Sequence, residues 1–408
     1  MKRLRLGVYL FVFSAFLFFA PLVFCAEVFH HGGTGACQGC HTTPPDLIGT
    51  DAGSTCLRCH QAKVGVTPPD QYYVATDPAT FSLCVQLPPG GDFCWLKRNY
   101  SWSPGGTRKT QRSAGDSHGH NIVAVDYGYR PDSSFAVAPG GTYPSASLSC
   151  ISCHDPHGNY RRLEDGSIAA SGPPVVASGS YPGSPEPSSS GAVGVYRMLA
   201  GIGYRPKIAP GVPAFVADPP LAIAPSLYNR AETTDNTRVV YGSGMSEWCQ
   251  NCHSPINDSH MHPVGNRAAF SAEIINNYNS YIASGKITGS PATAYTSLVP
   301  YELGAKDYTL VKMMAKTAGS SGPAGAANVM CLSCHRAHAS GWDRMLRWNM
   351  QADFIIYDGV YPGIDNNTPP HLAQGRTAAE TQKAFYDRLV SSFAKFQKNF
   401  CNKCHVKD

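Results

Sequence analysis

Hydrophobic residues form few regular patterns along this chain of 408 residues. The longest apolar run, from Leu6 to Phe24, follows a basic N-terminus, which is the arrangement of an export signal ending at residue 26. An uncleaved membrane anchor and lipidation at Cys25 are the alternatives. Phe24 is bulkier than is usual at its position, both for cleavage after Ala26 and for lipidation of Cys25. No later segment is apolar over a length that could cross a bilayer. We therefore expect a signal peptide at 1–26 and a single domain at 27–408.

Two later stretches have the spacing of an amphipathic helix. The first covers 268–284, where Phe270, Ile274, Tyr278 and Ile282 align and Gly285 is a stop signal. The second begins with a capping box, in which Thr377 and Glu380 satisfy each other's backbone groups. Its apolar positions continue toward the C-terminus at Phe385, Leu389, Phe393, Phe396 and Phe400. We expect both faces to belong to the core.

Most of the remaining chain has neither a helical nor a strand period. Gly (40) and Pro (32) together exceed one residue in six, and the segments 171–191 and 206–225 read as loops. The predicted fold is mostly coil and turns, with a few short α-helices and little β. So much irregular chain needs a core that ordinary elements do not supply.

Six copies of one pentapeptide, C-x-x-C-H, offer that core. The cysteines are Cys37, Cys40, Cys56, Cys59, Cys150, Cys153, Cys249, Cys252, Cys331, Cys334, Cys401 and Cys404. The histidines that follow them are His41, His60, His154, His253, His335 and His405. A single C-x-x-C could belong to a zinc site or a redox dithiol, but C-x-x-C-H is the signature of covalent c-type haem attachment. The sequence predicts a multihaem c-type cytochrome wrapped around a stack of six haems.

Motif spacing and the remaining cysteines add two expectations. His41 and His60 are separated by one short segment, so the first two haems should be close neighbours. Cys84 and Cys94 flank a Pro-Pro-Gly-Gly turn, and in an oxidising compartment they should form a disulfide. Two free thiols are the alternative.

Nine further histidines could bind the second face of the irons. They are His30, His31, His118, His120, His157, His260, His262, His338 and His371. His157 and His338 have the strongest case, because each follows a motif histidine by three residues and could reach its own or a neighbouring haem. Methionine is the competing distal ligand, but histidines are in surplus, so bis-His iron is expected. Iron closed on both faces cannot take a substrate, and no catalytic constellation stands out, so an enzyme is not expected.

The formal charge of +5 overstates how basic the exported protein is. Residues 1–26 carry Lys2, Arg3 and Arg5 and no acidic residue, so the mature chain has about +2. Six ferric haems with their propionates would bring this to about −4. The charge therefore gives no reason to expect nucleic acid as a partner.

Several stretches resemble a known family of hexahaem outer-surface c-type cytochromes of metal-reducing bacteria. They include FHHGG before the first motif, GHNIVAVDYGY, CHDPHGNYRRLEDGSIA, YGSGMSEWCQNCH, CLSCHRAHASG and the terminal CNKCHVKD. The resemblance covers essentially the whole mature chain. It implies that copies polymerise into extracellular filaments with a continuous haem stack, in which each subunit lends a histidine to its neighbour.

The resemblance also implies five distal ligands, namely His30, His120, His157, His262 and His338. The chain departs from the family where the histidine donated across the interface is expected, because that position is Pro44. His31, His118, His260 and His371 remain as candidates for the sixth. We favour His31, since adjacent side chains in extended chain point to opposite sides, and His30 and His31 could then serve two subunits.

The expected function is electron transfer through bis-His haems, in a filament that carries electrons to external acceptors such as metal oxides. Expected partners are other copies of the chain, other c-type cytochromes and those acceptors, at the outer cell surface. A monomeric periplasmic shuttle is the alternative from the carrier class, and a multihaem reductase is the alternative from the enzyme class.

Overall fold

The computed structural model describes residues 37–43, 45–62, 73–104, 109–224, 232–235, 238–253, 262–317 and 319–405. The expected signal peptide, the histidines His30, His31 and His260, and Pro44 lie outside these ranges. The division into a signal peptide and one domain therefore stays a prediction.

Within these ranges secondary structure is short, as the glycine and proline content predicts. The α-helices are α2 (Ala52–His60), α3 (Met245–Cys249), α4 (Ala272–Ser280), α5 (Tyr308–Thr317), α6 (Cys331–Cys334), α7 (Pro370–Ala373) and α8 (Ala378–Ala384). Between them lie single 3-10 turns, including η1 (Phe93–Lys97), η5 (Cys150–Ser152), η6 (Tyr196–Met198), η10 (Asp343–Met345) and η12 (Phe400–Lys403). The mostly-coil fold class is confirmed.

The strands form small ribbons rather than one large sheet. They are β1 (His41–Thr43), β2 (Asp46–Leu47), β3 (Tyr100–Trp102), β4 (Gln111–Ser113), β5 (Arg161–Arg162), β6 (Ile168–Ala169), β7 (Val175–Ala177), β8 (Ala192–Gly194), β9 (Ala222–Ile223), β10 (Val240–Tyr241), β11 (Phe354–Ile356) and β12 (Gln397–Lys398). The largest sheet has the order β6-β5-β8-β7, and only its β7–β8 pair is parallel. The other strands pair two by two. The segments expected to be loops thus contain only short strands, β7 and β9.

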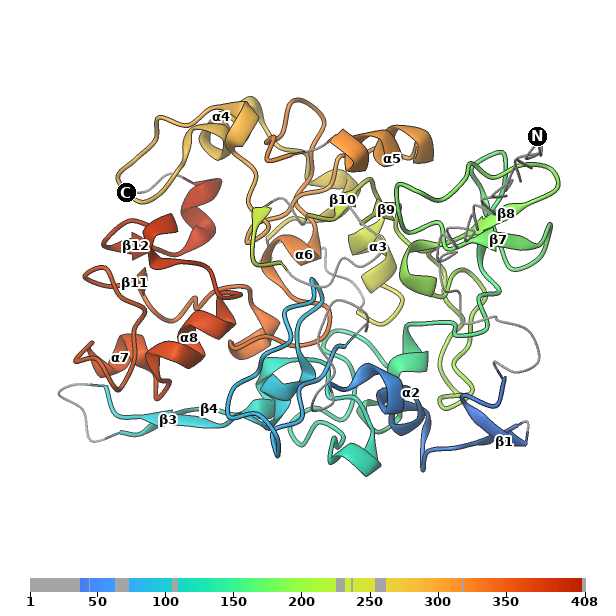
Figure 1. Ribbon diagram of the computed structural model, residues 1–408, viewed down its shortest axis with the longest axis horizontal. Helices are drawn as coiled ribbons and strands as arrows, with labels where there is room; N and C mark the ends of the chain where they lie inside the picture. Colours follow the sequence, from blue (N-terminus) through green and yellow to red (C-terminus); the bar gives the residue numbers. More distant parts are fainter. Residues whose placement is uncertain are drawn as a thin grey trace, which may run out of the picture.

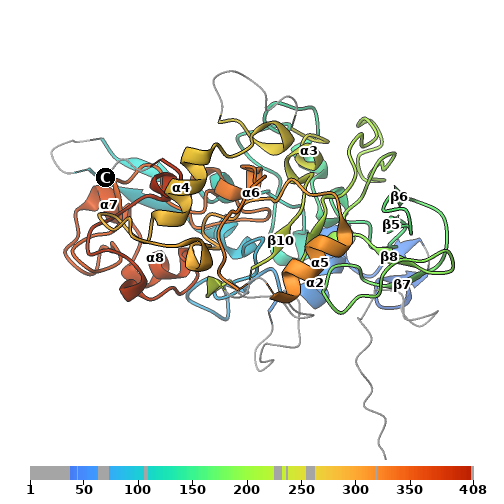
Figure 2. The same cartoon turned by 90° about the horizontal axis from the view of Figure 1, so that it is seen from above.

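The two ends of the long axis come from different parts of the chain (Figure 1). β1, β7 and β8 lie at one end, while α4, α7, α8 and the β11–β12 ribbon lie at the other. The view from above gives the same order, with α6 and β10 between the ends (Figure 2).

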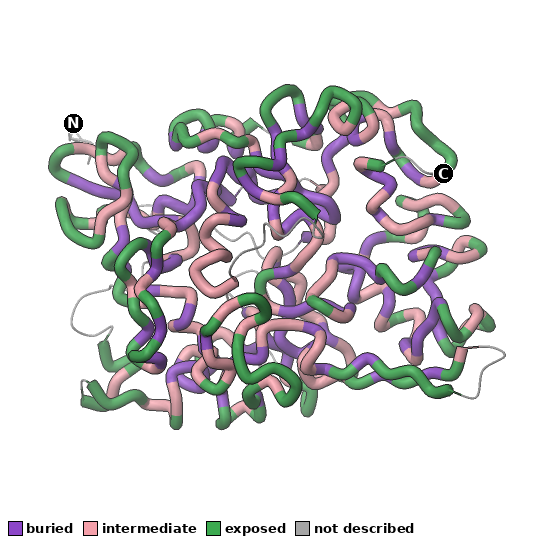
Figure 3. Tube along the Cα trace, turned by 180° about the vertical axis from the view of Figure 1, so that it is seen from behind, coloured by how far each residue is buried: buried purple, intermediate pink, exposed green. Residues whose placement is uncertain are grey.

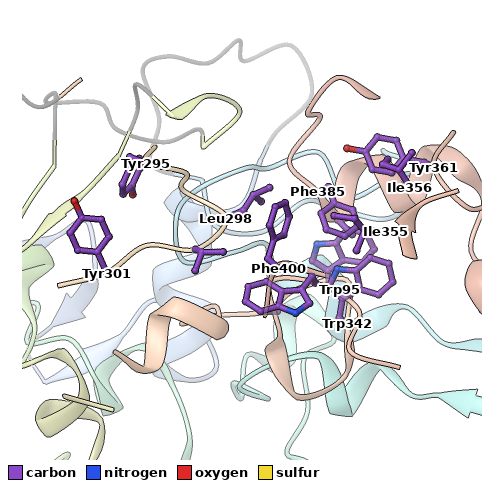
Figure 4. Close-up of a cluster of buried hydrophobic side chains, with 14 of the residues drawn as sticks. Trp95, Tyr295, Leu298, Tyr301, Trp342, Ile355, Ile356, Tyr361, Phe385 and Phe400 are labelled. Atoms are coloured by element: carbon purple, nitrogen blue, oxygen red, sulfur yellow. The ribbon is translucent and has the colours of Figure 1, made fainter. Parts of the chain in front are cut away.

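Buried residues are scattered along the whole trace and form no single central block (Figure 3). The largest apolar cluster joins 3-10 turn η1 to the C-terminal region through aromatic side chains (Figure 4). In it, Trp342 and Tyr361 lie on either side of Phe385, with ring centroids 5.5 and 5.7 Å from that ring. The other buried apolar residues that the structure describes form smaller, separate clusters, so no ordinary hydrophobic core spans this part of the chain.

The prediction of a long C-terminal helix from Thr377 is wrong beyond the first two turns. The capping box is present, but α8 ends at Ala384 because Tyr386 and Asp387 have φ of +59° and +55°. Left-handed residues cannot continue a right-handed helix. Phe385 and Phe400 are buried, but Leu389 is 67 % exposed and Phe396 43 %, so the apolar stripe is not one face.

The helix predicted at 268–284 exists but is shorter. α4 begins after Ser271, whose hydroxyl accepts the N–H of Ile274, and it ends at Ser280. Gly285 has φ of +73° in a later turn, beyond the helix end. Ile282 is 47 % exposed and does not join the buried face.

The disulfide predicted between Cys84 and Cys94 is confirmed, and both residues are buried. In the ranges that the structure describes, no helix has the length and apolar character needed to cross a bilayer.

Candidate haem-binding sites

The last four C-x-x-C-H motifs each fold as a helical turn, the second motif ends helix α2, and His41 of the first motif begins strand β1. The N–H of His154 donates to the carbonyl of Cys150 at 2.9 Å, and His335 donates to Cys331 at 3.0 Å. His253 and His405 make the same contact with Cys249 and Cys401. Residues three and four apart share one face of a helical turn, so both sulfurs and the imidazole face the same side.

Side chains that bond to the ends of these turns position several motifs. Asp51 accepts the N–H of Ser54 at 2.7 Å and starts α2, whose last residue is His60. In the third and fifth motifs the residue before the second cysteine is serine. Ser152 accepts the N–H of Ser149 at 2.9 Å, and Ser333 accepts that of Met330 at 3.1 Å. These bonds satisfy backbone groups that a helix start leaves open.

Backbone carbonyls fix the tautomer of five candidate ligands. The partners of the Nδ1 atoms are the carbonyls of Arg197 for His154, Pro139 for His253, Arg344 for His335, Ala337 for His120 and Pro263 for His262, at 2.7–3.0 Å. A carbonyl only accepts, so Nδ1 carries the proton and Nε2 keeps its lone pair for a metal. This is the arrangement expected of histidines that bind haem iron, so these side chains suit c-type haem.

Four pairs of imidazole rings face each other at the separation that bis-His iron requires. A metal–nitrogen distance of about 2 Å on each side places the two ring centroids roughly 6 Å apart. The observed pairs are His41–His157 at 6.4 Å, His154–His338 at 6.5 Å, His253–His120 at 5.9 Å and His405–His262 at 6.1 Å. Each joins one motif histidine to one histidine proposed as distal.

The pairing connects distant parts of the chain. His157 lies opposite His41 rather than opposite His154, and His338 lies opposite His154 rather than opposite His335. Both histidines that follow a motif by three residues therefore face the histidine of another motif.

Burial keeps the central imidazoles neutral. Burial, followed by the neighbouring His154, lowers the pKa of His338 to about 3. Burial and His253 lower the pKa of His120 to about 4. Neutral imidazoles have the free lone pair that metal coordination needs.

Two of the remaining candidates for the sixth distal ligand, His118 and His371, lie within the described residues. Both ring nitrogens of His118 are used inside the protein, since Nδ1 donates to the carbonyl of Trp95 and Nε2 lies 2.7 Å from Ser113 Oγ. His118 is therefore a structural residue and not a candidate ligand. His371 is exposed on α7.

Among the described residues no imidazole faces the ring of His335.

Cysteines of successive motifs lie next to each other. The side chain of Cys56 interacts with that of Cys150, and the side chain of Cys249 interacts with that of Cys331. Electrostatic interactions also link Cys40 with Cys56, Cys153 with Cys252, and Cys334 with Cys401. The six motifs therefore form one row in the order of the sequence.

Sequence reasoning missed a repeated tripeptide, Arg-Met-Leu, that supports two motif histidines. The carbonyls of Arg197 and Arg344 accept from His154 and His335, both at 2.8 Å. In each copy the Arg and the Met have positive φ, between +52° and +60°. A non-glycine residue rarely adopts this conformation without a functional reason. The repeat at 197–199 and 344–346 was the available signal.

Comparisons with known proteins agree with this arrangement. No protein-family model matches the chain. The chain is 46 % identical over 429 aligned residues to the C-type cytochrome OmcS of Geobacter sulfurreducens, covering 97 % of both chains.

Two solved structures resemble it closely, the OmcS nanowires (TM-score 0.83, 46 % identity) and the Outer Membrane Cytochrome S filament (TM-score 0.84, 45 % identity), both from Geobacter sulfurreducens. Each alignment covers 91 % of this chain and 98 % of the other. The chain therefore belongs to the family of the C-type cytochrome OmcS.

Proposed function

We propose that this protein conducts electrons through six covalently attached, bis-His c-type haems, as the subunit of an extracellular filament. Membership of the OmcS family makes the chain an electron-carrying c-type cytochrome with covalent haem rather than an enzyme. The observation that carries the proposal is the set of four facing imidazole pairs, spaced for iron and joined to motifs that form one row.

The proposed attachment residues are the twelve motif cysteines. The motif histidines would bind one face of each iron, and His157, His338, His120 and His262 would close the other face at four of the sites. When bound, haem iron supplies reversible one-electron transfer. The chain holds the imidazoles neutral and oriented, so little rearrangement need accompany a change of charge.

The order of the motifs supports conduction from one end of the molecule to the other. The first motif adjoins β1 and the last ends the described chain, at opposite ends of the long axis (Figure 1). Cysteines of successive motifs interact with each other, so each haem would have a neighbour on both sides within the subunit or across its ends.

Filament formation is carried over from the relatives, whose structures are filaments. We propose that His335 takes its distal ligand from a neighbouring copy, since no imidazole of the described residues faces it. His30 and His31 are the proposed remaining distal ligands, one acting within the subunit and the other across the interface. They lie outside the described residues.

The proposed location is the outer cell surface, reached through the signal at 1–26. Other c-type cytochromes would supply electrons, and external acceptors such as metal oxides would take them. Basic residues would neutralise haem propionates rather than bind nucleic acid.

The proposal is tested by intact mass and electron microscopy of the purified full-length product. The mass after acid denaturation should exceed that of the apoprotein by six haems, and micrographs should show filaments. Fewer haems would contradict the cofactor assignment. Compact particles alone would favour the monomeric periplasmic shuttle. A His31→Ala variant should uncap one iron and shorten the filaments, whereas His371→Ala should change neither.

A further inference from the structure

We propose that the loop from Cys84 to Cys94 positions two distal histidines, His338 and His120, and that its disulfide holds both imidazoles in place. The inference rests on the proposed function, because it takes these imidazoles to be ligands of neighbouring irons. The disulfide would then set the ligand geometry of the two central haems.

The loop is a closed and internally bonded unit. The disulfide joins its ends, and the N–H of Gly91 donates to the carbonyl of Pro88 at 2.9 Å to form the turn between them. Asp92 is buried, and its carboxylate accepts the N–H groups of Cys94 and Gln86 at 2.9 and 3.1 Å. These contacts give the loop one conformation.

The loop contacts His338 on its backbone and on its ring. The carbonyl of Gly90 accepts the N–H of His338 at 2.7 Å. The Phe93 ring stacks on the imidazole, with centroids 4.7 Å apart and planes 22° apart. At Gly91, where φ is +97°, a Cβ atom would lie 1.7 Å from the carbonyl oxygen of Ala339. Only glycine permits this approach.

His338 in turn holds the segment that carries His120. The N–H of His120 donates to the carbonyl of His338 at 2.9 Å, and the bridge between Gly119 and Ala339 is antiparallel. The Nδ1 atom of His120 donates to the carbonyl of Ala337 at 2.7 Å. Three backbone segments are therefore layered, with 337–340 between the disulfide loop and 118–120.

A further hydrogen bond joins the segment that carries His120 to the residue that follows the disulfide loop. His118 donates through Nδ1 to the carbonyl of Trp95, the residue that follows Cys94. The segment carrying His120 is thus tied to the disulfide loop both directly and through His338. Opening the loop would loosen both distal ligands together.

The expected consequence is a change in ring orientation at two irons. The imidazole planes are 62° apart in the His154–His338 pair, 36° apart in His253–His120 and 9° apart in His41–His157. In low-spin ferric haem, steeply crossed axial imidazoles give a highly anisotropic electron paramagnetic resonance signal, whereas parallel ones give a rhombic signal. The nearly parallel His41–His157 pair can therefore be followed separately from the crossed pairs, among which His405–His262, at 69°, should give a second highly anisotropic signal that the disulfide loop does not affect.

The test is the double variant Cys84→Ser/Cys94→Ser of the full-length holoprotein. Loss or broadening of the signals from the His154–His338 and His253–His120 pairs, with an unchanged rhombic signal from His41–His157, is the expected result. Unchanged signals from both central pairs would overturn the proposal. Haem mass and the low-spin spectrum of the unmodified protein test the proposed function separately.

A second variant keeps the test valid if the double variant does not fold. Phe93→Leu retains the disulfide and removes the stacked ring, so only the His154–His338 signal should change. The control is Val311→Ala, in the separate apolar cluster that includes Val193 and Ile223. Its central signals should be unaltered, and a change equal to that of Phe93→Leu would overturn the specific role of the loop.

Discussion

The proposed haem sites at His154 and His335 have the same structure on the proximal side, where the C-x-x-C-H motif lies. They differ on the distal side, where the second imidazole would bind. In both, the hydroxyl of a serine inside the motif accepts the N–H of the residue that precedes the motif. The arginine carbonyl of an Arg-Met-Leu segment accepts a hydrogen bond from Nδ1 of the motif histidine at 2.8 Å. The N–H groups of Asp155 and Arg336 also reach the two Met carbonyls at the same 2.8 Å. The proximal half is thus a repeated unit.

The distal halves show what the repetition does not determine. His338 faces His154, whereas no imidazole of the described residues faces His335. The same proximal unit can therefore serve a site closed within the subunit and a site proposed to be closed by a neighbouring copy. The comparison separates the attachment of haem, which is local, from the proposed assembly of a filament, which would depend on the distal ligand.

The charges next to the two sites also have opposite signs. Asp155 follows His154 and is buried, accepting the N–H groups of His157 and Asn159. Arg336 follows His335 and is buried with Arg347, both paired with the single carboxylate of Glu232. Positive charge favours reduced iron, so the site at His335 should have the higher reduction potential.

The largest effect is expected from His338→Ala, which should make the site at His154 resemble an uncapped one. The iron should become high-spin and bind carbon monoxide stoichiometrically when reduced, because the distal ligand is gone. Optical and electron paramagnetic resonance spectra provide the measurement. His371→Ala, at an exposed position on α7, should leave the spectra unchanged. A fully low-spin His338→Ala protein would contradict the pairing.

Glu232→Gln should increase the charge difference between the sites at His154 and His335, and it should destabilise the protein. Two buried arginines would lose their counter-charge, which costs about 3–5 kcal/mol of unfolding free energy. The potential of the site at His335 should rise further, because the local charge becomes more positive. Denaturant unfolding and redox titration are the measurements.

The matched control is Glu186→Gln, whose carboxylate pairs with Lys312 at 2.8 Å but is half exposed. Its cost should be about 0–1 kcal/mol. Equal losses for the two variants would show that the buried cluster is not an ion-pair centre.

Met198→Val and Met345→Val test whether the two Arg-Met-Leu turns are equivalent. These methionines have φ of +54° and +57°, a conformation that β-branched residues resist. Each variant should lose about 1–2 kcal/mol of stability, by the same amount at both sites. Met350→Val, an exposed position without positive φ, is the control. Unequal losses would break the equivalence.

The smallest expected effect is that of Asp155→Asn. Removing one negative charge should stabilise the reduced site at His154 by about 1 kcal/mol. For one electron this raises the reduction potential by roughly 40 mV. Spectroelectrochemical titration measures the shift, and Asp165→Asn in an exposed turn is the control. A lower potential in Asp155→Asn would show that other charges dominate there.

Local features of the site were predictable, because they depend on spacing along the chain. A helical turn fixes the geometry of C-x-x-C-H in the last four motifs, and a ten-residue separation suited the disulfide between Cys84 and Cys94. The capping box at Thr377 was also correct. Which distal histidine faces which motif was not predictable from spacing, since His157 and His338 reach motifs other than their own only through the fold.

Other features failed for reasons of backbone conformation. The apolar period after Thr377 predicted a long helix, but Tyr386 and Asp387 adopt positive φ, which hydrophobic spacing does not reveal. Strands of two or three residues, such as β7 and β8, are too short for alternation to be visible. His118 looked like a ligand candidate, and only its contacts with Trp95 and Ser113 show its structural role.

The long-range imidazole pairs also impose an order on biosynthesis. In the proposed exported protein, His154 would leave the export channel well before His338, and His405 would follow later still. Thioether formation needs only the local pentapeptide, whereas the His154–His338 and His405–His262 pairs need residues from the C-terminal part of the chain. Haem attachment should therefore precede the closing of these two sites, whereas the His41–His157 pair needs no residue beyond His157. A copy truncated before its last motif would lack the His405–His262 pair.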